Sequence, residues 1–84
     1  MDTQAWRDQV YQEAFEATCA DLQRRRRAEP AFTRRKLEGL LETLYVRQGN
    51  DWAGQGVLRS LRLSATIAAH EHVRAEWRKE HRGD

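Results

Sequence analysis

Hydrophobic positions recur at helical spacing in three stretches of the chain, and residues 57–82 form the only stretch that is apolar on two sides. At 3.6 residues per turn, seven of its residues fall within roughly 120° and predict a core-facing stripe. These are Leu58, Leu61, Ala65, Ala68, Ala69, His72 and Val73. A second, mixed face with i, i+4, i+7 spacing consists of Leu63, Ile67, His70, Arg74 and Trp77. We therefore expect the helix at 57–82 to contact more than one neighbour.

Residues 3–28 predict a long first helix. Thr3 is a suitable N-cap, and Glu29 precedes Pro30, which disfavours the helical conformation at the residue before it. The apolar positions cover more than half of the helix circumference, which is wider than one stripe. They are Trp6, Val10, Tyr11, Ala14, Phe15, Thr18, Cys19 and Leu22. We expect this helix to meet two neighbours, or one neighbour and an external partner.

Residues 33–48 predict a shorter second helix. Thr33 is the expected N-cap, and Phe32 before it with Leu37 at the fourth helical position forms the pattern of a hydrophobic staple. A start at Pro30 is the alternative. The expected core positions lie on one narrow face, namely Leu37, Leu40, Leu41, Leu44 and Tyr45. Gly49 is the expected left-handed stop.

The segment GNDWAGQG at 49–56 predicts the second connection. Its one large apolar residue, Trp52, is expected to pack on the end of the bundle, and Asp51 is an alternative cap for an earlier third helix. The whole pattern predicts one all-α domain over residues 1–84. It is a three-helix up-down-up bundle in which the first and third helices are long and the second is short.

Unequal helix lengths lead to a prediction about assembly. At 1.5 Å per residue, the N-terminal end of the first helix and the C-terminal end of the third should each project about 15 Å beyond the second helix. Trp6 and Trp77 would then lie on unsupported ends, so we expect them to join Leu63 and Ile67 in a contact with a second copy or another protein. The alternative is that helix 57–82 lies between the other two helices, with both of its faces in the core of one chain.

Composition narrows the class of protein. Five glycines, one proline and few β-branched residues support an all-α fold. A single cysteine excludes an intramolecular disulfide and fits a reducing compartment. No apolar run approaches the ~20 residues of a membrane span, and the first residues lack a signal-peptide pattern. We therefore expect a cytoplasmic protein without membrane contact.

The net charge of +2 conceals a strong segregation of charge. Residues 1–23 carry one base and five acids (−4), residues 24–36 seven bases and one acid (+6), and residues 37–84 seven of each. The bases of the middle segment are Arg24, Arg25, Arg26, Arg27, Arg34, Arg35 and Lys36. Cations in the first turn of a helix oppose its dipole by about 0.3–1 kcal/mol each, and a bound anion would offset that cost. This end is expected to be a solvated surface, a site for nucleic-acid phosphates, or a contact for an acidic protein.

No motif predicts chemistry. His70 and His72 point about 160° apart on a helix, unlike the i, i+4 pair of a zinc site, and we expect His72 near the core stripe. Cys19 has no Cys-His signature and is expected to be a small buried residue. GNDWAGQG lacks the lysine and Ser/Thr of a P-loop.

Without a catalytic pattern, we expect no enzymatic activity, cofactor, metal or small-molecule substrate. The predicted function is that of a small interaction or adaptor module that self-associates. The alternative is a nucleic-acid-associated accessory or regulatory protein that binds phosphates through residues 24–36.

Overall fold

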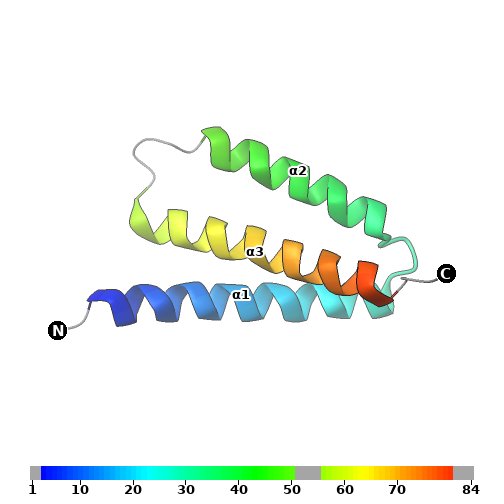
Figure 1. Ribbon diagram of the computed structural model, residues 1–84, viewed down its shortest axis with the longest axis horizontal. Helices are drawn as coiled ribbons and strands as arrows, with labels where there is room; N and C mark the ends of the chain where they lie inside the picture. The colour runs from blue at the N-terminus through cyan, green and yellow to red at the C-terminus, as the bar shows by residue number, and fades with distance from the viewer. Residues whose placement is uncertain (1–2, 51–55, 81–84) are drawn as a thin grey trace.

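The fold consists of three α-helices joined by two short connections. A computed structural model describes residues 3–50 and 56–80, with α1 at Thr3–Ala28, α2 at Arg34–Asn50 and α3 at Val57–Glu80. Their lengths are 26, 17 and 24 residues, and Figure 1 shows α1 and α3 running in one direction and α2 in the other, as in an up-down-up bundle. The predicted all-α fold with long first and third helices is confirmed.

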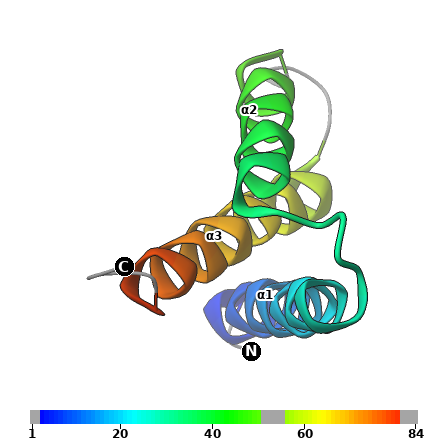
Figure 2. The same ribbon diagram turned by 90° about the vertical axis from the view of Figure 1, so that its right-hand side faces the viewer.

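α3 lies in the middle of the molecule. Figure 2 shows α1 on one side of it and α2 on the other, and no Cα atom of α1 comes within 8 Å of a Cα atom of α2 in the described parts of the chain. This is the alternative named above, in which helix 57–82 lies between the other two helices with both of its faces in the core of one chain. Because α3 is apolar on two sides, each flanking helix covers one of them. The radius of gyration is 14.5 Å, against about 12 Å for a compact domain of this length, so the arrangement is open.

The first stripe of α3 packs against α1. Ala65, Ala69 and Val73 are fully buried, and small alanine side chains let the two helices approach closely. The thiol of Cys19 on α1 lies 3.9 Å from the carbonyl oxygen of Ala69. Leu22, also on α1, joins Val73 in a buried cluster. Leu22, the buried hydrophobic side chain described in α1, therefore lies near the C-terminal end of that helix.

The second face of α3 packs against α2. Leu37 and Leu41 of α2 are buried, and so are Ile67 and His70 of α3. The Nδ1 atom of His70 lies 2.7 Å from the carbonyl oxygen of Thr66 and donates a hydrogen bond to it, which satisfies one nitrogen of the buried ring.

His72 departs from the predicted core stripe. It is exposed, with its ring 5.7 Å from that of Phe15 at the edge of the α1–α3 contact. His70 is thus the buried histidine, because the α2 side of α3 is covered along its middle turns.

The predicted start of the second helix is confirmed. The Oγ1 atom of Thr33 accepts a hydrogen bond from the backbone N–H of Lys36 at 3.2 Å, as an N-cap does. Phe32 and Leu37 share one buried cluster, so the hydrophobic staple is formed. The alternative start at Pro30 is not used.

The predicted stop at Gly49 is wrong. α2 continues to Asn50, and Gly49 does not have a positive φ. The described glycine with a positive φ is Gly56, at 84°, immediately before α3. Trp52 and Asp51, for which we predicted a packing role and a cap, lie outside the described residues.

The excess length of α3 lies at the opposite end from the one predicted. Its C-terminal end is level with the turn between α1 and α2 (Figure 1), where Glu80 pairs with Arg26 and Arg78 pairs with Glu38. The N-terminal end of α3 extends past the end of α2 instead, which leaves Val57 48% exposed. Contacts at the turn hold one end of α3, so the mismatch in length appears at the other.

Candidate functional site

The predicted cations gather at one end of the molecule. Residues 24–28 form the last turn of α1, residues 34–36 form the first turn of α2, and the C-terminal end of α3 lies beside them (Figure 1). We call this end the basic pole. The connection between the helices is tight, since the N–H of Phe32 donates to the carbonyl of Glu29 at 2.9 Å.

Two arginines of the basic pole stack on aromatic rings. The Cζ atom of Arg25 lies 4.5 Å from the centroid of Phe32, and that of Arg26 lies 4.5 Å from the centroid of Trp77. The two rings lie 6.1 Å apart between centroids. Each ring therefore has a guanidinium over it, an arrangement in which the cation is attracted by the ring quadrupole.

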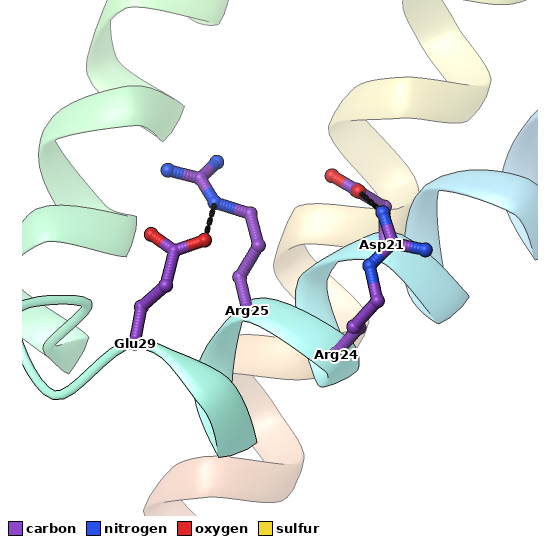
Figure 3. Close-up of polar contacts among 4 residues, drawn as sticks. All are labelled: Asp21, Arg24, Arg25 and Glu29. Carbon is purple, nitrogen blue, oxygen red and sulfur yellow. Dashed lines mark hydrogen bonds and ion pairs between the residues drawn. The ribbon is translucent and has the colours of Figure 1, made fainter.

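Ion pairs engage the same part of α1. Arg24 pairs with Asp21, and Nε of Arg25 lies 3.6 Å from Oε2 of Glu29. Figure 3 shows these two pairs on different sides of the helix end. Arg26 pairs with Glu80 of α3. Three of the four consecutive arginines are therefore engaged within the chain, and the Arg24–Asp21 pair, being exposed, contributes little stability.

Four cations of the basic pole remain unpaired within the described residues. They are exposed and have no carboxylate partner there: Arg27, Arg34, Arg35 and Lys36. The first turn of α2 contains no acid. Together they are the part of the predicted anion site that is free to bind an external anion.

The residues predicted for a partner contact do not form one surface. Ile67 is only 6% exposed and belongs to the core of the single chain, contrary to the prediction. Trp77 is half-buried against Phe32 and Arg26, so it does not lie on an unsupported end. Leu63 is half-buried between α2 and α3. The prediction is wrong for Ile67, because α2 covers that part of the second face of α3.

Trp6 is the predicted contact residue that stays open. It is 47% exposed near the start of α1. The other large hydrophobic side chains exposed in the described residues lie on the last turns of α2 and the first turn of α3, at the same end of the molecule (Figure 1). We call four of these side chains the apolar pole, namely Trp6, Val46, Val57 and Leu58; the fifth, Tyr45, points its hydroxyl to Glu71 in the C-terminal half of α3. Sequence periodicity wrongly placed Leu58 and Tyr45 in the core and gave no role to Val46 or Val57, because it does not state where a helix ends relative to its neighbours.

A groove of about 700 Å³ lies between the C-terminal half of α2 and the N-terminal half of α3. Its apolar lining includes Leu44, Val46 and Leu63, and three guanidinium groups border it, those of Arg47, Arg59 and Arg62. None of the described lining residues is acidic, and the three arginines form no ion pair within the described chain. Sequence analysis missed this groove, although the i, i+3 spacing of Arg59 and Arg62 places them on one side of a helix.

The described residues contain no cluster of side chains suited to catalysis or metal binding. Burial, followed by the nearby Glu76 carboxylate, raises the pKa of the Cys19 thiol, which disfavours the nucleophilic thiolate. Within residues 3–50 and 56–80, no three His, Cys, Asp or Glu side chains form a group that could hold a metal ion.

No described helix combines the length and the apolar character that crossing a membrane requires. No protein-family model, curated protein or solved structure matches this chain.

Proposed function

We propose that the protein is a non-enzymatic helical interaction module that self-associates through its apolar pole. The observation that carries this proposal is that four of the five exposed large hydrophobic side chains of the described residues gather at one end, while the basic pole is charged and tied by ion pairs. The free Cys19 thiol is compatible with the cytoplasm as the proposed location.

The cost of exposing this surface supports the proposal. A tryptophan side chain presents about 250 Å² at most, so Trp6 at 47% exposure leaves roughly 100 Å² in water, or about 2.5 kcal/mol at 25 cal/mol per Å². Two copies that cover Trp6 and Leu58 of each other would remove this cost twice. Eight hydrophobic side chains make up the buried core of the described residues, so one subunit has little other apolar burial to rely on.

Sedimentation at micromolar concentrations tests the proposal. We expect the wild type to form a dimer, and Trp6→Glu or Leu58→Glu to shift it to a monomer, because each places a charge in the buried contact. Ala75→Glu is the matched control, since Ala75 is an exposed residue in the C-terminal half of α3 and the added charge is the same. A monomeric wild type would refute the proposal, and so would Trp6→Glu and Leu58→Glu variants that associate as tightly as the control.

Binding of nucleic acid is the second candidate function. It is favoured by one observation, the four exposed cations of the basic pole that have no acidic partner in the described chain. Such cations would contact phosphates and give binding that weakens steeply with salt. The described aromatic residue nearest in sequence, Phe32, is buried and cannot stack on a base.

Anisotropy of a labelled oligonucleotide tests this second function. Arg27→Gln with Arg34→Gln should weaken binding and reduce its salt slope by about two, because two phosphate contacts are lost. The control compares Arg7→Gln with Arg27→Gln alone, because Arg7 is exposed near the opposite end of α1 and its substitution removes the same charge. Binding that is absent at low salt, or equal loss in both variants, would exclude a site at the basic pole.

A further inference from the structure

We infer that the groove between α2 and α3 of one copy receives the first half of α1 of a second copy. This inference rests on the proposed self-association and specifies the surfaces that meet. The groove has about 700 Å³, within the range of protein pockets that enclose a ligand of several rings. Because its lining is partly apolar and guanidinium groups border it, its occupant must supply an apolar group together with negative charge.

Charge complementarity points to α1. Arg47, Arg59 and Arg62 border the groove, and no described lining residue is acidic. Residues 5–16 of α1 carry three acids against one base, a net charge of −2. Two of these acids accept hydrogen bonds from neutral amides, Glu13 from Gln9 at 3.3 Å and Glu16 from Gln12 at 2.8 Å, and neither forms an ion pair within the described chain.

The free side of α1 combines this charge with apolar anchors. Phe15 faces α3, where its ring contacts His72, and at 100° per residue Trp6 lies about 180° from Phe15. Val10 and Glu13 lie within about 40° of Trp6 on the same side of the helix. α2 makes no approach to α1 in the described residues; Trp6 and Glu13 are exposed on this side, and Val10 is half-buried at its edge.

The two surfaces match the way an amphipathic helix binds in a groove. Such helices use anchors at i and i+4, which are Trp6 and Val10 here, against apolar lining such as Leu44 and Leu63. Carboxylates beside the anchors would then meet guanidinium groups at the groove edge, which is a favourable pairing for arginine. Twofold symmetry forms the contact twice, since each copy contributes one α1 and one groove.

Charge reversal on either side tests this arrangement. Glu13→Lys with Glu16→Lys gives a chain with a basic α1 and a basic groove, and Arg59→Glu with Arg62→Glu gives a chain with an acidic α1 and an acidic groove. Each variant alone should dimerise at least about tenfold more weakly than the wild type. An equimolar mixture of the two should recover a heterodimer, because both of its contacts pair opposite charges.

The control is Arg27→Glu with Arg34→Glu, which makes the same charge change at the basic pole and should leave the dimer intact. All the substituted residues are exposed, and circular dichroism checks that helix content is kept. Salt dependence of the wild-type dimer is a second readout that needs no variant, and its dissociation constant should rise with salt.

The outcomes separate the inference from the function on which it rests. A wild type that remains a monomer overturns both. A wild-type dimer whose stability is independent of salt, or that survives either charge reversal unchanged, overturns the groove contact and leaves self-association standing. A mixture of the two reversed variants that remains monomeric also overturns the groove contact. Restored dimerisation in the mixture supports it.

Discussion

Replacing Arg26 with glutamine tests whether arginines of the basic pole act in the structure of the chain. Arg26 stacks on Trp77, with Cζ 4.5 Å from the ring centroid, and pairs with Glu80. Its side chain is only 18% exposed, so the stack is largely removed from water. Arg27 is its matched control, because it lies in the same helix turn, is exposed and forms no ion pair in the described structure.

The expected loss of stability follows from these contacts. A partly desolvated cation–π contact contributes about 1 kcal/mol, and an ion pair with a half-exposed carboxylate about 0.5 kcal/mol after solvent screening. Arg26→Gln should therefore lower the free energy of unfolding by about 1.5 kcal/mol, which shifts the Tm of a domain of this size by roughly 6–12 °C. Arg27→Gln should stay within about 0.5 kcal/mol of the wild type.

Urea unfolding followed by circular dichroism measures both variants. Each loses one cation from the last turn of α1, so their effects on the helix dipole are equal and the difference between them reports the contacts of Arg26. Equal midpoints for Arg26→Gln and Arg27→Gln would refute a structural role for Arg26. The comparison should be made at one protein concentration, because association also shifts the midpoint.

Two further substitutions test local features of the fold. Gly56→Ala should destabilise the protein by about 1–2 kcal/mol in urea unfolding, because φ is 84° at this position. Gly39→Ala should stabilise it by about 0.5–1 kcal/mol, because Gly39 is helical. A Cβ would meet no atom within 4 Å at either position, so changes of the same sign in the two variants would contradict this reasoning. The hydrogen bond that Tyr45 donates to Glu71 raises the pKa of the phenol above 10.0, so its contribution is present below pH 10 and is lost as pH rises through the folded-state pKa. Tyr45→Phe should accordingly lose less stability than the wild type between pH 9 and about pH 12 in urea titrations, and an identical loss would exclude this linkage.

Local signals in the sequence were sufficient for the start of α2. Thr33 caps the helix and Phe32 packs with Leu37, as their positions predict, because both interactions involve residues within one helical turn. The stop predicted at Gly49 failed because a glycine alone does not end a helix. Glycine permits a left-handed conformation but does not require it, and helical φ is equally open to it.

The position of α3 along its neighbours could not be predicted from periodicity. A helical pattern states which side of a helix is apolar, but it does not state how far the helix slides along its neighbour. Contacts of Trp77 with Phe32 and Arg26 set that position, and they join residues distant in the sequence. The exposed apolar end of α3 is therefore Val57 and Leu58, and the residues suited to a partner contact changed with it.

The same limit applies to the basic pole. Composition counts seven equivalent positive charges, whereas the structure divides them into engaged and free groups. The partner of Arg26, Glu80, lies 54 residues away in the sequence, so no local pattern could have identified the pair. The sequence therefore predicted where the positive charge would gather, but not which of the seven cations would be free to bind an anion.

The central place of α3 has a consequence for how the chain folds during synthesis. No Cα atom of α1 comes within 8 Å of one of α2 in the described residues, so before α3 is synthesised the two helices can share only the small cluster of Leu22, Phe32 and Leu37. Leu22, Leu37 and Leu41 then stay accessible to chaperones and proteases until the 24 residues of α3 emerge, which takes roughly 1–5 s at ordinary translation rates. α3 therefore completes the packing of both helices, and we expect a chain interrupted before it to be degraded more readily than one that includes it.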